Sequence, residues 1–240
     1  MPNNFSWVPF YKEFADNLDY WENRQNELIE FIEVLRKKNL KVTPLTDKDD
    51  QDDRFLLTEI DPFTVFGVFN RGIVEKERIA ILSEFKKKFD IKSPLPEDFT
   101  GIPILNNQRS WFFGYQYKRK KEDIPKLWHV FKLALRKDAK ENKDFHKAFD
   151  EALQVWGVNT NLTMGLFWMR PEQFLNLDKT NRAYLRIKFP ADGISSKFYF
   201  NTLNRVTAQT KSPAILILTH KISSQPFIAS SFEQLDRGHG

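Results

Sequence analysis

The chain has 240 residues and a formal net charge of +5, and 41% of its residues are hydrophobic, including 23 Phe and 6 Trp. It contains no Cys, which excludes disulfides and thiolate metal sites and fits a reducing compartment. Because there are only 4 His, a zinc site is not expected, and no cofactor is predicted.

The sequence lacks the apolar segments that mark membrane or secreted proteins. No run of about 18 apolar residues predicts a membrane span. The first residues, MPNNFSWVPFYKEF, lack the basic and apolar regions of a secretory signal. We therefore expect a cytoplasmic protein with no membrane partner.

Apolar residues recur at helical spacing along most of the chain. Helices are expected over 7–39 in two segments, from Pro62 with Asp61 as N-cap and Gly72 at the end, over 75–89, from about 125, and over 143–156, 162–169 and 196–209. The polar run 46–54 is expected to be an exposed loop, and 214–219 has the pattern of a strand.

This order of elements predicts a mainly α fold (α+β with minor strands). The expected division is an N-terminal helical segment over 1–45, a main helical domain over 55–210, and a strand with a poorly ordered tail over 211–240. The main domain is expected to contain an element like a helix-hairpin-helix.

The stretch 106–121 combines aromatic and basic residues. Its aromatic residues are Trp111, Phe112, Phe113, Tyr115 and Tyr117, and its cations are Arg109, Lys118, Arg119, Lys120 and Lys121. Aromatic faces stack on bases while cations neutralise phosphates, so the pattern is typical of nucleic-acid binding. A buried aromatic strand followed by a solvated basic turn would produce the same pattern.

A second cationic group lies earlier in the chain. It consists of Asn70, Arg71, Lys76 and Arg78. These residues have the chemistry to contact phosphate, but exposed cations at the start of a helix give the same sequence.

A tight turn is expected between the helices over 143–156 and 162–169. Gly157 and Val158 open it, and Asn159 stands where a second glycine is usual in a helix-hairpin-helix. Asn is the next-best residue after Gly for a positive φ, so the turn can still form. The amides of Thr160, Asn161 and the next residues would then point towards a phosphate. An ordinary glycine turn between two core helices is the alternative.

Asp178 is the carboxylate that follows this turn. The alternatives for it are a helix N-cap, a salt bridge to Arg182 four residues on, or a catalytic group. Elsewhere the sequence has no P-loop and no clear nucleophile elbow or nuclease motif. Whether the chain is an enzyme is left open, with a non-catalytic role favoured.

Four blocks of the chain together resemble a known family. The blocks cover 7–18, 61–72, 101–113 and 157–185, within about 5–210, and they resemble the N-terminal target-recognition region of McrB-type AAA+ restriction proteins. The resemblance implies a DNA-binding module of a restriction or defence system, with an AAA+ motor and a McrC-like nuclease as partners. The sequence stops where the motor would begin.

Residues 155–185 also resemble helix-hairpin-helix DNA glycosylases. Some of those enzymes have a nucleophilic Lys at the position of Asn161, so Schiff-base chemistry is excluded here. A monofunctional glycosylase that uses Asp178 on a flipped base remains allowed.

Three functions are therefore carried forward from the sequence. The leading one is a module that binds double-stranded DNA through its phosphate backbone and through a modified or flipped base. The alternatives are a glycosylase-like enzyme that uses Asp178 and a protein-interaction domain that docks a partner subunit.

Overall fold

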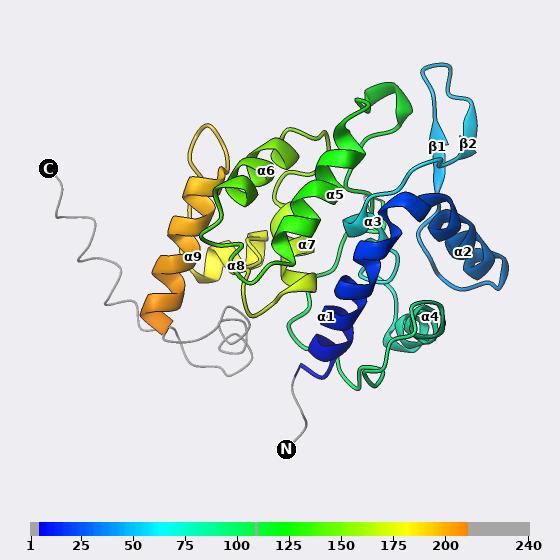
Figure 1. Ribbon diagram of the computed structural model, residues 1–240, viewed down its shortest axis with the longest axis horizontal. Coiled ribbons are helices and arrows are strands. Elements are labelled where there is room, and N and C mark those ends of the chain that lie inside the picture. Colours follow the sequence, from blue (N-terminus) through cyan, green and yellow to red (C-terminus); the bar gives the residue numbers. More distant parts are fainter. Residues whose placement is uncertain (1–4, 109, 211–240) are drawn as a thin grey trace, which may run out of the picture.

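The computed structural model describes residues 5–108 and 110–210, and these are mainly helical (Figure 1). The α-helices are α1 (Trp7–Leu18), α2 (Gln25–Lys37), α3 (Pro62–Gly67), α4 (Glu75–Lys88), α5 (Asp123–Ala134), α6 (Lys143–Leu153), α7 (Asn161–Met169), α8 (Lys179–Tyr184) and α9 (Ser196–Thr210). Two short 3-10 helices are η1 (Asp19–Arg24) and η2 (Gln116–Lys118), and the two strands are β1 (Thr46–Lys48) and β2 (Arg54–Leu56). The prediction of a mainly α fold with minor strands is confirmed.

Helix α7 lies at the centre of the hydrophobic core. Every residue from Leu162 to Met169 is buried, as expected for a helix that is apolar on all sides. The helix packs closely on α3, because a Cβ added to Gly165 would come within 2.4 Å of the Phe63 ring. The indole Nε1 of Trp168 donates a hydrogen bond to the carbonyl oxygen of Pro103 at 2.8 Å. These contacts hold α7 in the core, and the predicted turn lies directly before its first residue.

Helix α1 also packs on α7 and belongs to the same core. Its residues Trp7 and Phe14 are completely buried among aromatic rings of later elements, with Trp7 5.8 Å from Phe167 and Phe14 4.8 Å from Phe66 between ring centroids. Residues of the predicted N-terminal segment 1–45 therefore pack in the same hydrophobic core as residues of the predicted main helical domain 55–210. The predicted strand 214–219 and the segment 211–240 lie outside the described residues.

Helix α3 begins as predicted and ends earlier. Asp61 is the N-cap, and its Oδ1 accepts hydrogen bonds from the amides of Phe63 and Thr64. The helix ends at Gly67 rather than at Gly72, which corrects the expectation. The reason is that the chain from Asn70 onward pairs with a later segment, and the amide of Leu105 donates to the carbonyl of Asn70 at 2.8 Å.

The segment 46–54, predicted to be an exposed loop, forms most of a small antiparallel hairpin that projects from the body (Figure 1). Lys48 pairs with Arg54 across the hairpin. Oδ1 of Asp49 accepts the amides of Gln51 and Asp53, so an aspartate side chain closes the turn. Strands of three residues are too short to show an alternating pattern, which is why the sequence analysis missed them.

None of the helices within residues 5–108 and 110–210 is long and apolar enough to cross a membrane.

Candidate functional site

The two stretches singled out in the sequence lie against each other. The ring of Trp156, at the start of the predicted turn, covers Gly114, where an added Cβ would be only 2.9 Å from the indole. Gly157 lies over the backbone of Phe113. The side chains of Tyr115, Tyr117 and Trp156, together with those of Lys48 and Lys118, form one patch, which we call the aromatic–lysine surface.

The three rings of this surface are unusually exposed for aromatic side chains. Trp156 is 53% exposed, Tyr117 45% and Tyr115 39%. Tyr115 and Tyr117 are nearly parallel, with ring centroids 6.2 Å apart and an interplanar angle of 14°. Trp111 packs edge-on against Tyr115, with ring centroids 5.6 Å apart, and its indole Nε1 donates to the carbonyl of Pro44. Tyr115 is therefore held by Trp111 and stacked with Tyr117, while all three rings of the surface remain more than a third exposed.

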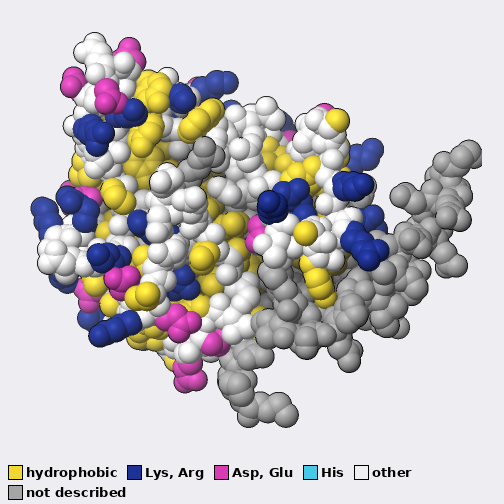
Figure 2. Space-filling model, turned by 180° about the vertical axis from the view of Figure 1, so that it is seen from behind, with side chains coloured by type: hydrophobic (Ala, Val, Ile, Leu, Met, Phe, Trp, Pro, Cys, Tyr) yellow, Lys and Arg dark blue, Asp and Glu magenta, His cyan; other side chains and the backbone are white. Residues whose placement is uncertain are grey.

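Lysine ammonium groups lie over these rings. Nζ of Lys118 is 4.6 Å from the ring centroid of Trp156 and 5.4 Å from that of Tyr117. Nζ of Lys48 lies over both tyrosines, at 5.3 Å and 5.6 Å, and also pairs with Asp52 at 2.6 Å. Figure 2 shows hydrophobic side chains gathered beside the acidic tip of the β1–β2 hairpin, with Lys and Arg side chains at their edge.

Lys120 and Lys121 continue the positive charge towards α5. Both side chains are exposed, and neither they nor Lys118 form an ion pair with any residue that the structure describes. Their charges are therefore available to an anion from outside the molecule. Arg109, the first cation of the predicted stretch, lies outside the described residues.

Arg119 belongs to the same run but is part of the protein interior. Its side chain is only 10% exposed, and Nη2 lies 2.9 Å from Oδ2 of Asp47, which is completely buried. Its Nη1 donates to the carbonyl of Gly114, and its guanidinium lies 5.1 Å from the Phe113 ring centroid. Oδ1 of Asp47 accepts the amides of Gln116 and Lys48. Arg119 therefore fastens the aromatic stretch to the hairpin and is not available as a DNA contact.

The turn between α6 and α7 has the predicted backbone geometry. Gly157 has a φ of 94° and Asn159 a φ of 40°, so Asn replaces the second glycine as expected. Asn159 is exposed, and the amides of Gly157, Asn159 and Thr160 donate no hydrogen bond to any described residue. These amides are free to meet an anion.

The first amides of α7 differ from the prediction. The amide of Asn161 donates to the carbonyl of Val158 at 2.9 Å, and those of Leu162 and Thr163 donate to Asn159 and Thr160. These tight hydrogen bonds use the donors that the sequence analysis assigned to a phosphate at Asn161 and beyond. The free donors of the turn therefore end at Thr160.

Asp178 is the N-cap of α8. Its Oδ1 accepts the amide of Asn181 at 2.7 Å, and its Oδ2 accepts the side-chain amide of Asn176 at 2.9 Å. The alternative ion pair with Arg182 is not formed, because that guanidinium donates to the carbonyl of Leu177 and lies over the Phe189 ring. Both carboxylate oxygens are therefore engaged, Oδ1 in the helix cap and Oδ2 with Asn176.

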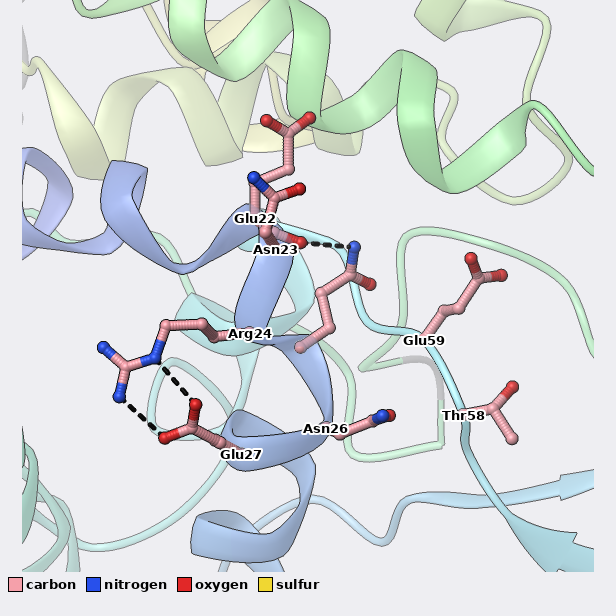
Figure 3. A pocket seen from close by; sticks show the side chains of 8 residues that line it. Glu22, Asn23, Arg24, Asn26, Glu27, Thr58 and Glu59 are labelled. Atoms are coloured by element: carbon pink, nitrogen blue, oxygen red, sulfur yellow. Dashed lines mark hydrogen bonds and ion pairs between the residues drawn. The ribbon is translucent and has the colours of Figure 1, made fainter.

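The chain also has open depressions away from this surface. One of about 350 Å3 lies where η1 and the start of α2 face Thr58 and Glu59 (Figure 3). Its charges are largely paired within the protein, since Arg24 binds Glu27 through two hydrogen bonds and Glu22 pairs with Lys132. Glu59 is the exposed carboxylate of this depression that forms no ion pair with a described residue.

Sequence reasoning missed Trp156 and Lys48 as members of the surface. Trp156 is predicted to end a helix, whereas α6 ends at Leu153 and leaves this side chain exposed. Lys48 lies in an acidic run, and only the hairpin brings it over Tyr115 and Tyr117.

The comparisons with known proteins give one match. A family model described as Domain of unknown function (DUF8425) covers residues 7–227. No curated protein and no solved structure matches the chain.

Proposed function

Since the chain belongs to the family described as Domain of unknown function (DUF8425), whose description assigns no activity, we propose a function from its surface: a module that binds DNA. The observation that carries the proposal is the contact of Trp156 with Lys118, next to the free amides of the α6–α7 turn. Aromatic faces, unpaired cations and bare amides together offer partners for bases and phosphates.

Each part of the surface has a distinct task in this proposal. Lys118, Lys120 and Lys121 neutralise phosphates, and binding releases the counterions of the DNA. The amides of Asn159 and Thr160 donate to one phosphate oxygen, as in a helix-hairpin-helix element. Tyr117 and Trp156 offer ring faces to a base, with a stacking contribution of about 1–3 kcal/mol per base.

The acidic tip of the β1–β2 hairpin sets the direction of approach. Asp49, Asp50, Asp52 and Asp53 lie there, and Asp52 already binds Lys48. This tip would repel a phosphate backbone. The strand is therefore expected to run along Lys118–Lys121 and the turn at 157–160, with only its bases directed towards Tyr115 and Tyr117.

The other two functions have less support from the site. A glycosylase would need a carboxylate free to act on the sugar, whereas Asp178 is engaged as an N-cap. A protein partner would also cover the exposed rings, but a purely apolar interface has no use for three unpaired lysines. The resemblance to McrB-type proteins, and with it an AAA+ motor and a McrC-like nuclease as partners, stays a prediction.

Binding of a fluorescent duplex, measured by anisotropy at several salt concentrations, tests the proposal. The variant Lys118→Ala/Lys120→Ala/Lys121→Ala is expected to bind more weakly and to lower the slope of log affinity against log salt by about 2–3 units. The control is Lys137→Ala/Lys143→Ala/Lys147→Ala, which removes the same charge beyond the far end of α5. If both triple variants have the same slope of log affinity against log salt, Lys118, Lys120 and Lys121 do not contact DNA phosphates.

The single variant Trp156→Ala tests whether the exposed indole stacks on a base of the DNA. Loss of the ring is expected to weaken duplex binding while leaving the salt slope unchanged, because stacking releases no counterions. If the wild-type chain binds no duplex at low salt, with or without base methylation, the protein-interaction alternative replaces the proposal.

A further inference from the structure

Arg71 lies at a corner where three segments of the chain meet. Its Nε donates to Oδ1 of Asn107 at 3.0 Å, and its Nη1 donates to Oγ1 of Thr43 at 3.3 Å. The backbone of the next residue, Gly72, makes two hydrogen bonds with the Asn107 side-chain amide. The guanidinium is thus positioned by neutral groups from two other segments and remains partly exposed.

The charge of Arg71 has no counter-ion. No carboxylate among the described residues forms an ion pair with it, and these two hydrogen bonds leave part of the guanidinium fork without a partner. Burial lowers the pKa of Arg71 from its usual value, because the charged form loses hydration there. An anion that replaces this hydration would be bound favourably.

A second guanidinium increases the positive potential of the corner. Arg78 is 5% exposed, and it donates to the carbonyls of Phe69 and Arg71 while lying over the Phe99 ring. It also forms no ion pair with a described carboxylate. Arg71 and Arg78 are therefore two arginines whose described partners are neutral groups, and the Arg78 guanidinium donates to the backbone carbonyl of Arg71.

A series of contacts connects this corner to the aromatic–lysine surface. Thr43, which holds the Arg71 guanidinium, precedes Pro44, whose carbonyl accepts the indole N–H of Trp111. Trp111 in turn packs on Tyr115, which stacks with Tyr117. A short series of direct contacts thus leads from Arg71 to the exposed rings, and Lys118 and Trp156 lie at the other end.

We propose that Arg71 is a second phosphate-binding point, at the opposite end of the aromatic–lysine surface from Lys118 and the α6–α7 turn. This inference rests on the proposed DNA-binding function and extends it: the bound strand would be held at both ends of the ring surface. A guanidinium suits this role because its planar fork matches two phosphate oxygens and is weakly hydrated.

The test compares duplex binding by the wild-type chain, Arg71→Gln and Arg71→Lys. Arg71→Gln is expected to weaken binding about tenfold or more and to lower the salt slope by about 1 unit. Arg71→Lys keeps the charge but loses the planar guanidinium. Its affinity for the duplex is therefore expected to lie between those of the wild type and Arg71→Gln, with a salt slope near that of the wild type. The control is Arg136→Gln, an exposed arginine paired with Asp138 just past the end of α5.

These outcomes distinguish the role inferred for Arg71 from the proposed DNA-binding function on which it rests. If the triple lysine variant loses affinity while both Arg71 variants bind as the wild type does, Arg71 is not a binding point and the proposed function stands. Absence of any duplex binding by the wild-type chain overturns both. Should thermal unfolding show that Arg71→Gln is not folded, Arg71→Lys decides: wild-type affinity in that variant rejects the inference.

Discussion

Arg119→Ala is expected to lower the free energy of unfolding by about 3 kcal/mol, because it leaves the carboxylate of Asp47 buried without its cation. Asp47 keeps the two amide hydrogen bonds to Oδ1, but Oδ2 has no other polar partner among the described residues. Chemical denaturation followed by circular dichroism measures the change. Lys120→Ala, next in the chain and fully solvated, is the control and is expected to change stability by less than about 0.5 kcal/mol.

The double variant Arg119→Ala/Asp47→Asn distinguishes this ion pair from a general loss of packing. Because the neutral amide no longer needs a cation, it should recover part of the lost stability. Equal stability of Arg119→Ala and Lys120→Ala would mean that Arg119 does not fasten the aromatic stretch to the hairpin. A loss of DNA binding in Arg119→Ala counts as a structural effect if the free energy of unfolding also falls in that variant.

Asp61 is expected to make stability depend on pH between about 4 and about 7. Burial raises its pKa from 3.8 to about 7, the value at which the native carboxyl ionises. Between these values the native state holds a proton that the unfolded state has released. Stability therefore falls as pH rises through this range and levels off above about 7, with a contribution on the order of 4 kcal/mol.

The variant Asp61→Asn isolates this contribution. Its Oδ1 still accepts the amides of Phe63 and Thr64, and its amide nitrogen occupies the place of the protonated carboxyl oxygen. Relative to the wild type, the variant should become more stable as pH rises from 4 to 8. A difference in unfolding free energy that stays constant across this range would show that Asp61 ionises normally.

This carboxyl also bears on the surface, because α3 anchors the aromatic stretch. Oγ1 of Thr64 accepts the amide of Phe112 at 2.9 Å, two residues before Gly114. Above neutral pH the buried carboxyl is charged, and the cost of that buried charge destabilises the fold at this anchor.

Helical periodicity predicted most of the fold because the apolar faces are long and local. Residues of α1, α2 and α4 recur at helical spacing, and the Asp61-Pro62 pair marked the start of α3. The hairpin and the end of α3 depend on distant partners: Asn70 pairs with Leu105, and Asp47 with Arg119. Such pairings leave no local pattern, so the sequence could not place them.

The same limit applies to the site. Composition identified the aromatic and basic stretch, and Gly157 with Asn159 identified the turn, but their contact through Trp156 and Gly114 depends on the tertiary fold. Lys118 and Arg119 are indistinguishable as neighbouring cations in the sequence. They differ because a buried aspartate more than sixty residues earlier, at position 47, binds only the second of them.

The most direct test of the central claim is amide hydrogen exchange of the full chain with and without a DNA duplex. Asn159 and Thr160 donate no hydrogen bond to any described residue, so their amides should exchange quickly in the free protein. We predict that duplex slows exchange at 157–160 and across 115–121. Unchanged exchange in both segments, with protection confined to other parts of the molecule, would contradict the account.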